Sequence, residues 1–97
     1  MINNKKFNFK NSVIMKEMIS LNRSWLSGHY KNVAGFNVCI FSNMDTVSIE
    51  DPDDDRVSYF WDGNEGSDII DRMTELWLTG NCTQDDAVLQ WMQLNII

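Results

Sequence analysis

The sequence has very little of what small enzymes and metal sites usually require. It contains one histidine, His29, and two cysteines, Cys39 and Cys82, among 97 residues. Two cysteines are too few for a disulfide framework, and their positions, in an apolar run and near a turn glycine, predict free thiols in a reducing compartment. We therefore expect a cytoplasmic protein without a structural disulfide.

Long apolar runs are also missing, since no stretch approaches the roughly 20 residues that span a bilayer. The lysine-containing start of the chain is not followed by an apolar segment or a small-residue cleavage site, so we expect no secretory signal and no membrane partner. One proline and no repeat or linker indicate a single domain over 1–97, with 1–11 as a loosely ordered arm. An apolar fraction of 43% is ample for its core.

Catalytic and phosphate-binding motifs are absent from the sequence. His29 stands in the turn after the first expected helix with no serine or cysteine motif around it, so no nucleophilic triad is recognisable. A histidine at a helix C-terminus commonly interacts with the terminal carbonyl groups. No glycine-rich phosphate loop is present, and carboxylates on turns lack the desolvation that paired-carboxylate catalysis needs. We expect a protein that is not an enzyme and holds no cofactor.

The most acidic segment, EDPDDDR at 50–56, has part of the pattern of a calcium loop. Counted from Asp51, aspartates occupy the first, third and fifth positions, as in an EF-hand. Arg56 replaces the glycine of the sixth position, and Asp62 replaces the bidentate glutamate of the twelfth. We expect no metal site, and a weak calcium-binding or structural module is kept as a third function class.

The periodicity of apolar residues predicts a small α+β domain with the order helix, three strands, helix, helix. Alternation of side chains predicts strands over 36–41, 46–50 and 56–61, joined by short turns into a three-stranded antiparallel sheet. Two later helices are expected, from Ser67 to Gly80 and from Thr83 onward. All the helices are expected to pack on one face of the sheet.

The first helix is expected from a cap at Ser12 to about Ser27, with Gly28 as its stop. Helical spacing predicts one apolar stripe along it. The stripe consists of Ile14, Met18, Leu21 and Trp25, widened by Met15, Ile19 and Leu26.

Positive charge is nearly absent from the second half of the chain. Residues 1–44 carry six basic side chains and one acidic, a net charge of +5, whereas residues 45–97 carry two basic and thirteen acidic, a net charge of −11. Such a surface repels nucleic acid and attracts basic proteins, although an acidic net charge also serves solubility alone. Ten of the acids lie between positions 45 and 71, mainly on expected turns: Asp45, Glu50, Asp51, Asp53, Asp54, Asp55, Asp62, Glu65, Asp68 and Asp71.

Three consecutive aromatic residues, Tyr59, Phe60 and Trp61, follow the acidic segment. Because side chains alternate across a strand, either Phe60 or the pair of Tyr59 and Trp61 points away from the helices. Exposed aromatics beside acids are typical interface anchors, and an exposed aromatic strand edge would favour a homodimer. The sequence leaves open whether all three pack in the core instead.

The N-terminal arm has a pattern seen in nucleic-acid-binding segments. Lys5, Lys6 and Lys10 interleave with Phe7 and Phe9, a combination that can contact phosphates and stack on bases. The acidic second half of the chain opposes the approach of a polyanion. We therefore expect no direct nucleic-acid contact, with the two phenylalanines anchoring the arm on the core.

The tetrapeptide DGNE at 62–65 and the order of elements point to a known class of proteins. The chain resembles small acidic phage-encoded inhibitors of bacterial defence, in particular DNA-mimicking anti-CRISPR proteins that block the PAM-reading site of a Cas9-type nuclease. In those proteins an acidic hairpin turn meets arginines of the nuclease, which implies contact roles for Asp62, Asn64 and Glu65 here. There the turn joins two strands, whereas here it leads into a helix.

The leading hypothesis is a non-catalytic inhibitor, acting in the cytoplasm of a bacterial host. Its acidic surface would mimic nucleic acid and block the basic DNA- or RNA-binding site of a host defence nuclease or Cas effector. The alternative is an immunity protein or antitoxin that caps a basic nuclease toxin, because its surface would look the same. The residues predicted to contact the partner are Glu50, Asp51, Asp53, Asp54, Asp55, Tyr59, Trp61, Asp62, Asn64, Glu65 and Asp68.

Overall fold

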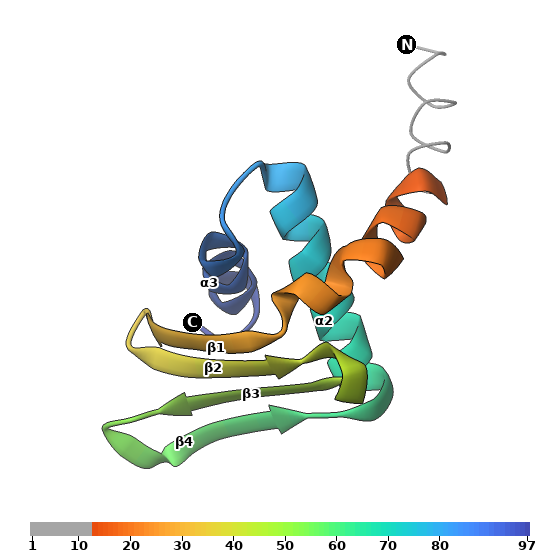
Figure 1. Ribbon diagram of the computed structural model, residues 1–97. Coiled ribbons are helices and arrows are strands. Elements are labelled where there is room, and N and C mark those ends of the chain that lie inside the picture. The colour runs from red at the N-terminus through yellow and green to blue at the C-terminus, as the bar shows by residue number, and fades with distance from the viewer. Residues whose placement is uncertain (1–12) are drawn as a thin grey trace.

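The structure is a computed structural model that describes residues 13–97. The expected arm, the cap at Ser12 and the lysines and phenylalanines of 5–10 lie outside these residues. The described part is an α+β fold, as expected, in which helices and a four-stranded antiparallel sheet form one body (Figure 1). Within residues 13–97, no helix has the length and apolarity needed to cross a membrane.

The elements follow one another through short connections. A helix over 13–22 continues into the 3-10 helix η1 (Arg23–Leu26). The sheet then forms in chain order from β1 (Gly28–Val33), β2 (Phe36–Phe41), β3 (Thr46–Asp51) and β4 (Asp54–Trp61), with the 3-10 helix η2 (Ser42–Met44) between β2 and β3. The helices α2 (Gly63–Gly80) and α3 (Gln84–Asn95) complete the domain.

The prediction of three strands is wrong, because β1 occupies positions where we expected a helix stop and a turn. The turn residues Ala34 and Gly35 both have positive φ, 51° and 88°, and return the chain directly as β2. Positive φ at both central positions matches the twist of the two strands that a tight hairpin joins. Regular alternation is hidden in β1, because the pairing register shifts between its two buried residues, Tyr30 and Val33.

Helices α2 and α3 cover one face of the sheet and leave the other face open (Figure 1). The period-two alternation of β2 and β3 causes this, since it directs every second side chain toward the helices. Four of those side chains are at most 2% exposed and meet the apolar stripes of both helices in one core: Val38, Ile40, Val47 and Ile49. The central members of this core are Val38, Ile40, Val47, Ile49, Ile70, Met73, Val88 and Met92.

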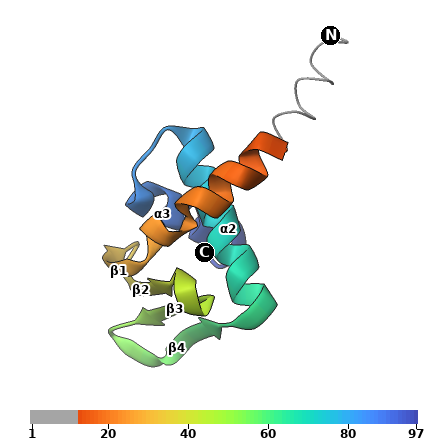
Figure 2. The ribbon, with the colours of Figure 1, turned by 45° about the vertical axis from the view of Figure 1, so that its right-hand side comes forward.

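The N-terminal helix leaves its expected apolar stripe in solvent. Leu21 and Trp25 are 72% and 68% exposed, and Ile14 and Met18 are exposed as well. The helix lies across α2 (Figure 2) with Arg23 directed at the body, where it pairs with Asp71 of α2. These polar contacts set the rotation of the helix, so its buried or half-buried apolar residues are Met15, Ile19 and Leu26.

Helix α2 begins five residues earlier than expected, because its N-cap is Asp62 rather than Ser67. Its first turn passes so close to the loop before β3 that Gly66 is buried against the backbone of Asp45. Ser67 lies inside the helix, and its hydroxyl accepts a hydrogen bond from Arg23 Nη2 at 3.1 Å. The start of α2 is therefore positioned by tertiary contacts as well as by its cap.

Candidate functional site

The polar residues of the predicted contact set, all acidic except Asn64, form two groups at opposite ends of β4 (Figure 1). The hairpin cluster surrounds the β3–β4 turn and comprises Glu50, Asp51, Asp53, Asp54 and Asp55. The helix cluster surrounds the start of α2 and comprises Asp62, Asn64, Glu65 and Asp68. Because β4 is 8 residues long and a strand rises about 3.3 Å per residue, the β3–β4 turn and the start of α2 lie roughly 25 Å apart. Glu50, opposite Ser58 of β4, lies between these two ends.

The hairpin cluster is held by its own turn. Asp51 Oδ1 accepts a hydrogen bond from the backbone N–H of Asp53 at 2.9 Å. Arg56 reaches back to Asp54 with two guanidinium contacts, Nε to Oδ1 at 3.0 Å and Nη2 to Oδ2 at 3.3 Å. The side-chain hydrogen bond from Arg56, and then the bond from its backbone N–H, lower the pKa of Asp54. A single arginine therefore offsets one of the five acids.

The remaining acids of the hairpin cluster face solvent. Glu50, Asp53 and Asp55 are exposed, and no hydrogen bond or ion pair to their carboxylates occurs among residues 13–97. Their charges are thus available to an approaching cation.

The helix cluster contains the DGNE tetrapeptide, which forms the N-cap and first turn of α2. Asp62 caps the helix through its backbone, because its carbonyl oxygen accepts from the N–H of Gly66 at 3.0 Å while its side chain makes no capping bond. Asp62, Asn64 and Glu65 are exposed. Asp68 is exposed one turn further on, 3.5 Å from Arg72 Nε. The partial positive charge of the helix N-terminus offsets part of this negative charge.

Two of the ten acids counted in the sequence serve the fold instead of the surface. Arg23 donates to Asp71 Oδ1 at 2.9 Å from Nε and to Asp45 Oδ1 at 3.0 Å from Nη2. Its Nη1 also donates to the carbonyl oxygen of Ser42 at 3.2 Å. Burial acts to lower the pKa of Arg23, but the hydrogen bonds to Asp71 and Asp45 outweigh it and raise the pKa.

The three aromatics of β4 divide between the two faces of the sheet. Phe60 is 64% exposed on the open face. Trp61 is half-buried on the helix side, stacked on Tyr59 at 5.6 Å and edge-on to Trp91 at 5.6 Å. Tyr59 is 37% exposed, so of the two aromatics predicted to contact a partner it is more accessible than Trp61.

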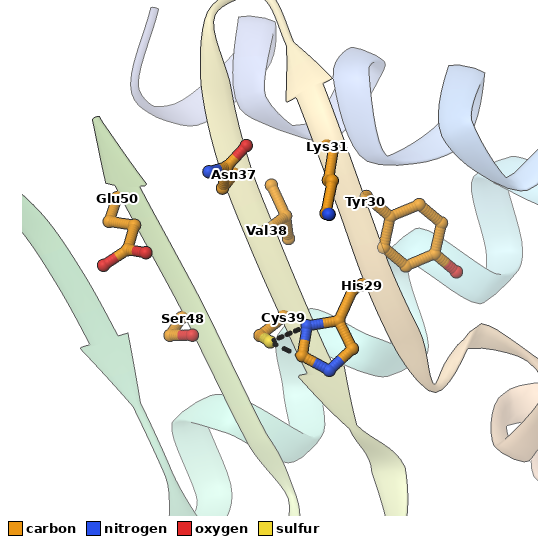
Figure 3. Close-up of a pocket in the computed structure, with 8 residues that line it drawn as sticks. All are labelled: His29, Tyr30, Lys31, Asn37, Val38, Cys39, Ser48 and Glu50. Atoms are coloured by element: carbon orange, nitrogen blue, oxygen red, sulfur yellow. Dashed lines mark hydrogen bonds between the residues drawn. The ribbon is translucent and has the colours of Figure 1, made fainter. Parts of the chain in front are cut away.

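The structure also brings together two residues that the sequence analysis separated. His29 was expected in a turn, yet it lies in β1 directly opposite Cys39 of β2. His29 Nδ1 is 2.9 Å from Cys39 Sγ on the open face (Figure 3). The Ala34–Gly35 turn signals the hairpin but not this pair, because a regular two-residue turn would place His29 opposite Ile40. The register shift between Tyr30 and Val33 places His29 opposite Cys39 instead.

The pair borders a shallow hollow of about 170 Å³ on the open face. On the same face, Cys39 lies opposite Ser48 of β3, and Ser48 lies opposite Phe60 of β4. Lys31, Asn37 and Glu50 complete the polar rim, so Glu50 belongs both to this hollow and to the hairpin cluster.

No group of three or more His, Cys, Asp or Glu side chains is arranged to hold a metal ion among the described residues. The hairpin aspartates therefore do not converge as the ligands of a calcium loop would. Comparison of the chain with protein-family models, with curated proteins and with solved structures gave no match in any of the three.

Proposed function

We propose that the protein is a non-catalytic inhibitor whose acidic surface occupies the nucleic-acid-binding site of a basic partner. One observation carries the proposal: two clusters of exposed carboxylates are held at the two ends of the edge strand β4, one by a tight turn and one by a helix N-terminus. Carboxylates on a folded scaffold keep a set spacing, unlike those of an acidic tail. They can therefore match a set spacing of cations on a partner.

The charge balance of the described body supports a basic partner. Residues 13–97 contain all 14 acids of the chain and five of its basic side chains. Three of those five, Arg23, Arg56 and Arg72, are paired with acids inside the molecule. Because such a surface repels a polyanion, a protein that binds a polyanion is the better partner.

The dimensions suit a site built for a duplex. Duplex DNA carries one charge per about 1.7 Å of its axis, so proteins that bind it line their grooves with Lys and Arg over tens of ångströms. Clusters at the two ends of β4, which lie roughly 25 Å apart, would reach two sets of such cations across one groove. Arginine–carboxylate pairs would supply strong contacts at each end, and Tyr59 lies on the strand between them.

Within this class we propose a host defence nuclease as the partner, either a Cas9-type effector or a restriction enzyme. The acidic surface and the position of Asp62, Asn64 and Glu65 at one end of it support this choice, in line with the resemblance to anti-CRISPR proteins. A nuclease toxin bound by an immunity protein would present the same basic chemistry. The two are distinguished by which nuclease the protein inhibits.

The test is a DNA-cleavage assay with purified nucleases of the three kinds, titrated with the protein. We expect cleavage to stop near one equivalent of protein for the true partner, and excess non-specific duplex or high salt to relieve the inhibition. Capture from a bacterial lysate at low and high salt identifies further candidates for the same assay.

A matched pair of variants separates the surface from net charge. The test variant neutralises Asp53, Asp55, Asp62 and Glu65 to their amides, and the control neutralises Glu17, Glu75, Asp85 and Asp86, which are exposed elsewhere. Both change the net charge equally. We expect the test variant to lose inhibition and the control to retain it. Equal inhibition by the two variants, with the same salt dependence, would contradict the proposal.

A further inference from the structure

We propose that Cys39 is a reactive thiol, activated by His29, that forms a mixed disulfide with a small peptide disulfide of the glutathione class, which carries both carboxylate and ammonium groups. The site is the hollow on the open face of the sheet (Figure 3). It is independent of the proposed inhibitor function, because its chemistry depends on a face that the two acidic clusters only border through Glu50.

The geometry supplies a base for the thiol. His29 Nδ1 is 2.9 Å from Cys39 Sγ, while Nε2 is 3.8 Å away, so one ring nitrogen is clearly directed at the sulfur. The ring is also held by Phe41, which meets it edge-on at 5.9 Å and 84°. With its proton on Nε2, the imidazole accepts the thiol proton at Nδ1 and leaves the thiolate, which is the nucleophilic form.

The reaction is thiol–disulfide exchange. The Cys39 thiolate attacks one sulfur of the disulfide R–S–S–R, so a bond from Cys39 Sγ to that sulfur forms as the original S–S bond breaks. The departing thiolate takes the proton from His29 and leaves as R–SH. Cys39 is oxidised and one sulfur of the incoming disulfide is reduced, so the disulfide itself is the oxidant.

The rim of the hollow indicates which disulfides fit. Lys31 offers an ammonium group, Glu50 a carboxylate and Asn37 an amide, all bordering the same hollow as Cys39. A peptide-like disulfide carries carboxylates, ammonium groups and amides that can pair with these three groups. A neutral aromatic disulfide has no carboxylate, ammonium or amide group, so its reaction rate depends on the reactivity of the thiol and not on contacts with the rim.

Cys82 is a built-in control. It is half-buried, and the groups near its sulfur are the Leu76 carbonyl oxygen at 3.8 Å and the Gln90 amide nitrogen at 3.9 Å. Neither group can act as a base at neutral pH, so the Cys82 thiol has no activating partner among residues 13–97.

The first experiment measures rates of mixed-disulfide formation at pH 7 by mass spectrometry, with glutathione disulfide and with dithiodipyridine. The Cys82→Ser variant, which retains Cys39, is expected to react about tenfold faster than the Cys39→Ser variant, which retains Cys82. Adding His29→Gln to Cys82→Ser is expected to slow both reagents about tenfold, and circular dichroism checks that the variant is folded. Equal rates for the two cysteines, or no effect of His29→Gln, would overturn the proposal.

The second experiment tests the ligand class in the Cys82→Ser background. Lys31→Gln and Glu50→Gln are each expected to slow glutathione disulfide severalfold and to leave dithiodipyridine unchanged. Glu50→Gln is the more discriminating variant. Glutathione disulfide is net anionic, so if only long-range charge mattered, removing an acid would speed up its reaction with Cys39. Acceleration by Glu50→Gln would overturn the assignment of the ligand class.

Discussion

The backbone of Gly66 packs directly on the carbonyl group of Asp45, with no room for a side chain between them. A Cβ at Gly66 would overlap the Asp45 carbonyl oxygen, and it would lie 2.9 Å from the carbonyl carbon and 3.0 Å from the Trp61 carbonyl oxygen. All three obstacles are backbone atoms, which cannot move away as a flexible side chain would. This contact joins the first turn of α2 to the loop before β3 and so sets where the helix cluster lies.

Replacing Gly66 by alanine is therefore expected to lower the free energy of unfolding by about 1–3 kcal/mol or more, as overpacking does. Urea unfolding followed by circular dichroism measures the change. Gly80→Ala is the control, because its Cβ would meet only the Cys82 sulfur at 3.3 Å and alanine favours the helix. A Gly66→Ala protein as stable as the Gly80→Ala protein would show that α2 does not approach the loop this closely.

Arg23→Gln is expected to destabilise the fold by about 1–3 kcal/mol, since it leaves Asp45 and Asp71 without their shared cation. The Arg23 side chain is 22% exposed, so solvent replaces its contacts only in part. Arg72→Gln removes an exposed pair between residues four apart in a helix and is expected to change the stability by less than about 0.5 kcal/mol. Equal effects of the two variants in urea unfolding would contradict the bridging role of Arg23.

Alanine substitutions at Leu21 and Leu26 test which side of the N-terminal helix faces the core. Leu26 is fully buried, so Leu26→Ala is expected to cost about 2–5 kcal/mol. Leu21 is 72% exposed, so Leu21→Ala is expected to change the stability by less than about 0.5 kcal/mol. Thermal and urea unfolding of both variants give the comparison. A larger loss at Leu21 than at Leu26 would mean that the helix buries the stripe predicted from the sequence.

Tyr30 is expected to make the stability fall at alkaline pH. Its hydroxyl donates to the Leu26 carbonyl oxygen at 2.6 Å, and burial, followed by the charge of Asp85, raises its pKa to about 12. An unfolded tyrosine titrates near pH 10. The contribution of the protonated Tyr30 hydroxyl to the free energy of unfolding is therefore complete below about pH 10 and is lost as the pH rises toward 12.

The measurement is the free energy of urea unfolding between pH 8 and pH 12 for the natural chain, Tyr30→Phe and Tyr59→Phe. The alkaline fall should be shallower in Tyr30→Phe, because phenylalanine has no proton to lose. Tyr59→Phe removes a phenol from a partly exposed site and should retain the steeper fall. Parallel curves for all three proteins would contradict the assignment to Tyr30.

The local sequence determined most of the secondary structure. The side chains of β2 and β3 alternate strictly, which indicates strands, and proline and aspartates indicate the turn between β3 and β4. Apolar residues at helical spacing indicate α2 and α3. Each of these signals lies within a few consecutive residues. The charge asymmetry was equally readable, because it depends on composition along the chain. The α+β class follows from these local signals.

The tertiary structure decided what depends on contacts between distant residues. The rotation of the first helix follows from Arg23 and its partners 22 and 48 residues away, which no helical periodicity contains. The separation of the acids into two clusters follows from the length of β4. Asp45 and Asp71 do not belong to either cluster, because both pair with Arg23. The His29–Cys39 pair exists because the register of β1 against β2 shifts between Tyr30 and Val33, which places His29 opposite Cys39 rather than Ile40. Each of these needs the three-dimensional register of the chain, since its partners carry no mutual signal along the sequence.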